Sequence, residues 1–196
     1  NGKHAYVSGY MDDAVSWYER NATSGVLTYG GLLKDGVGGV DGLDGPREIV
    51  LSPNEDFVYV TGVVDDEVSW FERNATSGAL SYRGKLKDGV AGVDGLNYPF
   101  DIALSPNGEH AYVVGQHDHS ISWFDRNSTS GALTYLGILK DGVGGVNGLQ
   151  EARAIVISPD GQHVYVSARV DDSVSWFARN ANTGALTFQG LLQNGV

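Results

Sequence analysis

Cysteine is absent from the 196-residue sequence, so the chain has neither a disulfide framework nor a thiolate metal site. No apolar run is long enough to span a bilayer. Basic residues are few, because 13 Lys and Arg stand against 24 Asp and Glu and give a net charge of −11. Nucleic acids and anionic membranes require clustered Lys and Arg. We therefore expect no nucleic-acid binding and no membrane insertion.

A unit of 53 residues is repeated along the sequence. Each copy carries Ser-Trp followed by an aromatic residue, at Trp17, Trp70, Trp123 and Trp176. A single unit of this length cannot bury its own apolar faces and needs neighbours to cover them. The period predicts an all-β propeller in one domain, residues 1–196, with repeats at about 1–45, 46–98, 99–151 and 152–196. Aromatic packing between neighbouring units is the expected role of the tryptophans.

The second repeat predicts four strands, at residues 47–52, 56–62, 68–73 and 79–85, followed by a glycine-rich connection at 87–96. This order describes an antiparallel propeller blade whose first strand lies near the axis. The first repeat lacks that innermost strand, which leaves a sheet edge without a partner. Either a ring of four blades closes with one three-stranded blade, or another chain supplies the edge. We favour a homo-oligomer, with a dimer preferred.

Acidic residues recur in the turn between the second and third strands of each repeat. In a propeller this turn shares a face with the connection to the next blade. Such carboxylates could bind Ca²⁺ or accept hydrogen bonds from sugar hydroxyls, although Asp is also an ordinary turn former. No other cofactor is expected. The ligand-binding candidates in these turns are Asp12, Asp13, Asp65, Asp66, Asp118, His119, Asp171 and Asp172.

The four repeats differ most where the innermost strand begins, at residues 44–48, 97–101 and 150–154. Variable loops on a rigid scaffold are where binding groups tend to lie. Four residues of these segments are further ligand-binding candidates, namely Arg47, Tyr98, Phe100 and Arg153.

One local cluster, His117, Asp118 and His119, has the side chains for a transition-metal site or a general base. A polar turn is the alternative. The remaining histidines, His4, His110 and His163, recur at the start of the second strand, where Asp56 stands for the second repeat. Their repetition predicts a structural hydrogen bond.

The second strand repeats a short phrase that ends in Gly or Ala: Tyr6-Val7-Ser8-Gly9, Tyr59-Val60-Thr61-Gly62, Tyr112-Val113-Val114-Gly115 and Tyr165-Val166-Ser167-Ala168. With the turn at 158–161 and the hairpin at 183–186, it resembles the lactonase-like propeller family, also called the YVTN type. The resemblance covers the whole chain. It implies a propeller fold and functions that range from sugar-lactone hydrolysis to binding modules of surface proteins.

Near-identical blades favour multivalent binding over a single catalytic site, so no catalytic residue is assigned. The prediction is a lectin-like propeller that binds carbohydrate or glycoconjugates through its loops and the clefts between blades, at an extracellular or cell-surface location. A lactone hydrolase that uses Arg47, Arg153 and the cluster from His117 to His119 is the first alternative. A structural surface repeat is the second.

Overall fold

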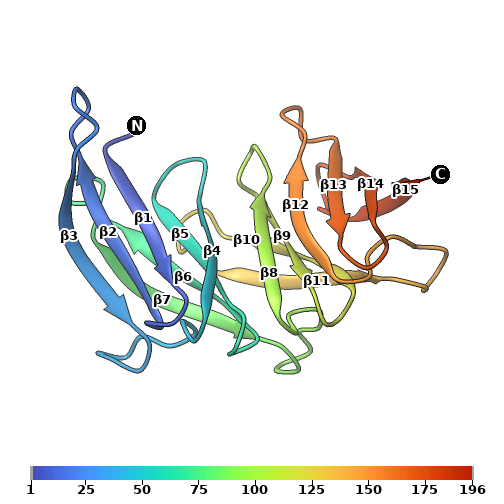
Figure 1. Cartoon of the computed structure of the whole chain (residues 1–196), viewed down its shortest axis with the longest axis horizontal. Helices are drawn as coiled ribbons and strands as arrows, with labels where there is room; N and C mark the ends of the chain where they lie inside the picture. Colours follow the sequence, from blue (N-terminus) through green and yellow to red (C-terminus); the bar gives the residue numbers. More distant parts are fainter. Residues whose placement is uncertain (1, 196) are drawn as a thin grey trace.

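The computed structural model describes residues 2–195, which form fifteen strands in four antiparallel sheets that follow one another in chain order (Figure 1). The first sheet contains β1 (His4–Gly9), β2 (Ala14–Arg20) and β3 (Leu27–Lys34). The second contains β4 (Pro46–Leu51), β5 (Phe57–Gly62), β6 (Glu67–Arg73) and β7 (Leu80–Lys87). The third contains β8 (Pro99–Leu104), β9 (His110–Gly115), β10 (Ser120–Arg126) and β11 (Leu133–Lys140). The fourth contains β12 (Ala152–Ile157), β13 (His163–Ala168), β14 (Ser173–Arg179) and β15 (Leu186–Gln193).

These sheets are the four blades that the sequence predicts, and blade 1 has only three strands within the described residues. The predicted all-β propeller is confirmed. The four strands expected in the second repeat match β4 to β7 to within two residues. In β5 and β9 every residue is buried, because blades cover both faces of these sheets.

A bulge in the third strand of each blade lets the tryptophan lie over a glycine of the outermost strand. In blade 2 the register shifts between Trp70 and Phe71, and Trp70 pairs with Gly84 of β7. A Cβ on Gly84 would lie 2.6 Å from Cζ2 of the Trp70 indole, so the position requires glycine. Trp70 is only 7% exposed and joins the apolar core between blades 2 and 3. The predicted packing role is confirmed for Trp17, Trp70 and Trp123, whereas Trp176 is half-buried and joins none of the three apolar cores of the described residues.

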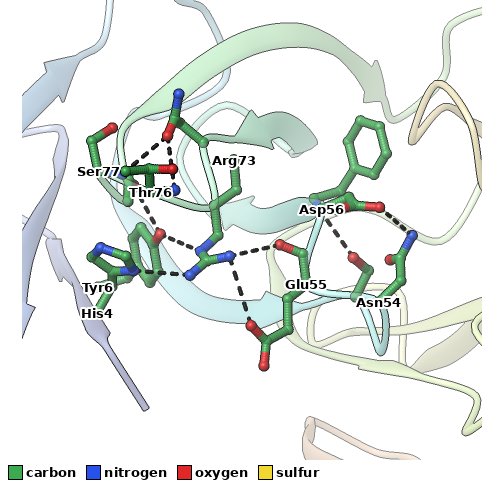
Figure 2. Close-up of polar contacts among 12 residues, drawn as sticks. His4, Tyr6, Asn54, Glu55, Asp56, Arg73, Thr76 and Ser77 are labelled. Atoms are coloured by element: carbon green, nitrogen blue, oxygen red, sulfur yellow. Dashed lines mark hydrogen bonds and ion pairs between the residues drawn. The ribbon is translucent and has the colours of Figure 1, made fainter. Parts of the chain in front are cut away.

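A hydrogen-bond network around a buried arginine joins each blade to the next, and Figure 2 shows the one between blades 1 and 2. At the first interface, the Tyr6 hydroxyl donates to the Gly78 carbonyl oxygen at 2.8 Å and accepts from Nε of Arg73 at 2.8 Å. Nη2 of Arg73 lies 2.9 Å from Nδ1 of His4. The same Tyr–Arg contact recurs at the next two interfaces, in Tyr59–Arg126 and Tyr112–Arg179. Each arginine is buried, and its charge is satisfied by atoms of both blades.

Two of the three histidines at the start of the second strand belong to this network, whereas His163 contacts no arginine within residues 2–195. His4 and His110 face Arg73 and Arg179, as expected of a structural hydrogen bond. The residue of blade 2 at this position is Phe57, so the assignment of Asp56 was one residue out of register. Because a phenyl ring cannot accept from Arg126, Nη2 of that arginine turns to Oδ1 of Asn54 at 3.4 Å.

The outer faces of the first and last blades are uncovered within residues 2–195. Val7 of β1 is 48% exposed, whereas its repeat equivalent Val60 is fully buried. Likewise Tyr165 of β13 is 39% exposed, whereas Tyr112 is fully buried. No helix in the described part of the chain is long and apolar enough to cross a membrane.

Candidate functional site

The acidic turns hold backbone amides at the start of the innermost strands. The first acid of each pair accepts from its own blade, as in Asp65 Oδ2 to the Asp44 amide at 2.9 Å. The second accepts from the next blade, as in Asp66 Oδ1 to the Tyr98 amide at 2.8 Å. In blade 3 an imidazole replaces the second carboxylate, and Nδ1 of His119 accepts from the Glu151 amide at 3.0 Å. These bonds confirm that the two sets of loops share a face.

Not every predicted turn residue makes such a bond. Asp13, Asp118 and Asp171 do, with the amides of Gly45, Asn97 and Gln150. Asp12 and Asp172 lie exposed in their turns. Ligand binding by any of these carboxylates stays a prediction.

Two triads of carboxylates bring oxygens within 4.8 Å of one another, Asp35–Asp41–Asp65 and Asp88–Asp94–Asp118. Both already hold a lysine ammonium. Nζ of Lys85 lies 2.7 Å from Asp41, and Nζ of Lys140 lies 3.0 Å from Asp94. Burial raises the pKa of Asp118 within the second triad. These contacts explain the clustering, and the binding of Ca²⁺ stays a prediction.

A second group of side chains surrounds the axis, where β4, β8 and β12 each present the same repeat position. Those positions are Arg47, Phe100 and Arg153. The Arg47 guanidinium carbon lies 3.4 Å from the centroid of the Phe100 ring, and that of Arg153 lies 5.1 Å from it. Two cations therefore share one aromatic ring, an arrangement that keeps both guanidinium groups at the axis.

Strained backbone places further side chains at this site. Blade 2 has Gly45 two residues before Arg47, with φ of 61°. The equivalent residues of blades 3 and 4 are Tyr98 and Glu151, with φ of 58° and 54°. Left-handed conformations cost free energy in residues other than glycine, and they concentrate at functional sites. The ring centroid of Tyr98 lies 4.5 Å from that of His117.

Glu151 joins a charged network beside the axis. Its carboxylate accepts from Nε of Arg169 at 2.7 Å and from Nε2 of Gln116 at 3.1 Å, and it lies 3.8 Å from Nη2 of Arg153. Within residues 2–195, Oε1 of Gln116 and Nε of Arg153 are buried without a hydrogen-bond partner. A buried polar atom of this kind is suited to contact with a bound molecule.

Two carboxyl groups occupy the next position along the inner strands, Glu48 in β4 and Asp101 in β8. Glu48 is exposed as a residue, but partial desolvation of its carboxyl group, and then the charge of Asp101, raise its pKa. Burial likewise raises the pKa of Asp101, although the amide of Ile155 donates to its Oδ2 at 2.8 Å. Arg47 lowers the pKa of both groups, but more weakly. Carboxylates of raised pKa are stronger bases.

The structure thus gathers five of the predicted site residues at the axis, namely Arg47, Tyr98, Phe100, His117 and Arg153. His117 and His119 diverge, because one stacks on Tyr98 and the other bonds to the Glu151 amide.

Sequence reasoning missed five residues of this site: Glu48, Asp101, Gln116, Glu151 and Arg169. Their signal was present in the repeat. Each occupies a position where the copies that contain it differ, and all but Arg169 adjoin, or are equivalent to, a predicted residue.

The fold is that of a β-propeller, and the axial cluster forms a charged site where its innermost strands begin. The chain belongs to the lactonase family of seven-bladed β-propellers, whose profile matches residues 1–94 and 98–195. A 6-phosphogluconolactonase of Pectobacterium carotovorum subsp. carotovorum is 27% identical over 160 residues, which are 82% of this chain and 47% of the relative. A 6-phosphogluconolactonase of Bacillus subtilis is 29% identical over 113 residues, 55% of this chain and 32% of the relative.

Solved structures show the same fold. A protein from Lactobacillus plantarum has a TM-score of 0.79 at 24% identity, over 97% of this chain and 54% of its own. The periplasmic gluconolactonase PpgL of Pseudomonas aeruginosa has a TM-score of 0.74 at 21% identity, over 98% and 51%. The chain thus spans about half the length of the Pectobacterium and Pseudomonas relatives.

These comparisons overturn the lectin prediction. The relatives are named for lactone hydrolysis, so carbohydrate binding, a glycoconjugate partner and a secreted lectin are wrong as readings of this chain, and the lactonase alternative fits better. The predicted homodimer is wrong as well. The family is seven-bladed, so an unpaired inner edge gives no reason to invoke a second copy. Location at the cell surface and a role as a surface repeat are untested.

Proposed function

We propose that this chain carries the catalytic face of a sugar-lactone hydrolase and that the axial cluster is its active site. The observation that carries the proposal is the approach of both Arg47 and Arg153 to the ring of Phe100, with carboxyl groups, Glu48 and Asp101, at the next position of the inner strands. The names of the relatives supply the substrate class, which includes 6-phosphogluconolactone and gluconolactone.

Hydrolysis of a lactone requires a base for the water and a cation for the oxygen that becomes negative. In our proposal the Glu48 carboxylate takes a proton from water as the water oxygen adds to the lactone carbonyl carbon. Arg47 stabilises the oxyanion. The ring C–O bond then breaks, and the released oxygen takes the proton from Glu48, which leaves the open-chain hydroxy acid and regenerates the carboxylate.

Arg153 and the network around Glu151 are suited to hold the rest of the substrate. The side chain of Arg153 is 40% exposed, so it can reach a bound molecule while Phe100 and Glu151 fix its direction. A second guanidinium near the first favours an anionic group on the lactone, because guanidinium binds phosphate and carboxylate in bidentate fashion.

The proposal predicts turnover of 6-phosphoglucono-δ-lactone above its spontaneous hydrolysis. Glu48→Gln should lower kcat by about 100-fold or more, because the amide cannot take a proton. Arg47→Ala should lower kcat/KM by about 100-fold, through loss of oxyanion stabilisation.

The rate should also depend on pH. Since the pKa of Glu48 is raised above the ordinary value for Glu, activity should fall as the pH drops through that raised pKa, where the carboxylate becomes protonated. Acid release at constant pH measures each rate.

Gln189→Leu is the matched control. Gln189 lies on β15, the outermost strand of its sheet, at the opposite edge from the innermost strand β12. It should leave the rate unchanged. Glucono-δ-lactone, which lacks the phosphate, tests the role of Arg153, and Arg153→Ala should reduce the preference for the phosphorylated substrate. An unchanged kcat in Glu48→Gln, or turnover no faster than the spontaneous rate, would refute the proposal.

A further inference from the structure

A cavity of about 420 Å³ lies between blades 2 and 3, away from the axial cluster. Phe57 and Trp70 form its apolar floor and are 5% and 7% exposed. Glu72 and Arg83 form an ion pair across its rim, with about half of each side chain exposed. The hairpin of blade 3 closes the other side with Thr129 and Ser130. The volume falls within the range of about 300–1,000 Å³ that is usual for small-molecule sites.

The rim charges are not part of the repeated scaffold. At the position of Glu72 the other blades have Glu19, Asp125 and Ala178, and at the position of Arg83 they have Gly30, Leu136 and Gln189. Blade 2 is therefore the one blade of the four that pairs an acid with an arginine across β6 and β7. The pair is dispensable for the fold, since the other three sheets form without it.

The floor of the cavity is also specific to this interface. Phe57 packs against Gly131 of the next hairpin, as His4 packs against Gly78 and His110 against Gly184. Where histidine stands, its ring makes a hydrogen bond to an arginine and the contact is polar. With phenylalanine the floor is apolar, and the Arg126 guanidinium carbon lies 5.6 Å from the ring centroid.

An apolar floor beneath adjacent charges of opposite sign matches one class of ligand. We propose that this cavity binds a free α-amino acid with an aromatic side chain. Its carboxylate pairs with the Arg83 guanidinium, and its ammonium group pairs with the Glu72 carboxylate, so the zwitterion inserts into the existing ion pair without leaving a charge unmatched. The aromatic side chain lies on the floor that Phe57 and Trp70 form, where aromatic contacts favour edge or offset stacking.

The proposal is tested by calorimetric titration of the whole chain with L-phenylalanine and two derivatives. We expect saturable binding of L-phenylalanine, with a Kd of about 1 mM or tighter. N-acetyl-L-phenylalanine lacks the ammonium group and L-phenylalaninamide lacks the carboxylate. Each should bind at least about 10-fold more weakly, because one rim charge then stays unpaired.

The repeat supplies matched variants. Arg83→Leu gives blade 2 the residue of blade 3, and Glu72→Ala gives it the residue of blade 4, so both substitutions use residues that the repeat already has at these positions. Each should weaken binding of L-phenylalanine at least about 10-fold. Gln189→Leu, at the Arg83 position of blade 4, should leave binding unchanged.

Three results would overturn the proposal: no saturable binding of L-phenylalanine, binding of either derivative as tight as that of L-phenylalanine, or unchanged binding in Arg83→Leu. Circular dichroism of each variant shows whether it is folded. The outcome is independent of the lactonase proposal, because the cavity shares no residue with the axial site.

Discussion

At the scale of single residues, a buried arginine joins neighbouring blades. Arg179 of β14 donates from Nε to the Tyr112 hydroxyl at 2.6 Å and from Nη1 to the Gly161 carbonyl at 2.9 Å, and its Nη2 lies 2.9 Å from Nδ1 of His110. An unpaired buried charge would be costly, so these partners are needed as a set. The imidazole has to stay neutral to accept from the arginine. Burial, and then the charge of Arg179, lower the pKa of His110.

His110→Phe should therefore change how stability depends on pH. Because the folded pKa of His110 is lowered, the unfolded chain binds its proton first, and the free energy of unfolding falls as the pH drops below about 6.5. The variant should lose this part of the slope. At pH 7 it should cost about 1 kcal/mol for the lost hydrogen bond, with the arginine free to turn toward the Asn107 position as Arg126 does toward Asn54.

Urea unfolding between pH 7.5 and 5.5 measures the difference. His163→Phe is the control, because it makes the same change at the same repeat position in blade 4, where no following blade brings an arginine within the described residues. Parallel pH profiles for the wild-type chain and His110→Phe would contradict the prediction.

At the scale of strands, the bulge in the third strand and the glycine opposite it act together. In blade 3 the register shifts between Trp123 and Phe124, and Trp123 pairs with Gly137 of β11. A bulge increases the local twist and turns the indole across the sheet, where it covers the paired glycine of the outermost strand, which has no side chain. The arrangement is repeated in all four blades.

Gly137→Ala should destabilise the chain by about 1–3 kcal/mol. The new Cβ would lie 2.5 Å from Cζ2 of the Trp123 indole, so the ring or the strand has to move. Thermal unfolding followed by circular dichroism measures the loss. Thr134→Ala, an exposed position on the same strand, should change stability by no more than about 0.5 kcal/mol. Equal melting temperatures for the two variants would show that the indole tolerates a methyl group.

At the scale of the whole molecule, stability depends on neighbours. Blades 2 and 3 are covered on both faces, and Val58, Val60 and Val113 are fully buried. Blades 1 and 4 each have one uncovered face among the described residues, where Val7 and Val174 are 48% and 47% exposed. In a repeat protein the free energy of opening a unit includes its interfaces, so the end blades open more easily than the middle blades.

Hydrogen exchange should follow this order. We expect amides of β5, β6, β9 and β10 to exchange most slowly, and those of β1, β3 and β15 to exchange fastest, because one interface is lost when an end blade opens and two are lost when a middle blade opens. Mass spectrometry of peptic fragments from the native chain measures the rates. Protection in β1 equal to that in β9 would contradict a nearest-neighbour description.

Much of the fold could be predicted from the sequence. Strand bounds in the second repeat came from alternation and turn residues, and the burial of Trp70 came from its repetition. The roles of the turn acids could not be predicted in the same way. Asp65 and Asp66 bond to amides 21 and 32 residues away, so the first partner depends on how the connection folds back onto blade 2 and the second on how blades 2 and 3 meet. The one-residue error at Phe57 has a different cause, because the fixed period of 53 residues already aligns Phe57 with His4 in the sequence.

The sequence by itself determined the repeat, the all-β blades, their order and the three-stranded first blade, because local alternation, turn chemistry and a fixed period of 53 residues specify each of these. The tertiary structure decided which variable residues meet. Arg47, Phe100 and Arg153 are 53 residues apart in sequence and join at the axis because adjacent blades place equivalent positions side by side. The physical reason is that local strand geometry sets the direction in which a side chain points within its blade. The angle at which whole sheets pack decides which side chains it meets across the axis.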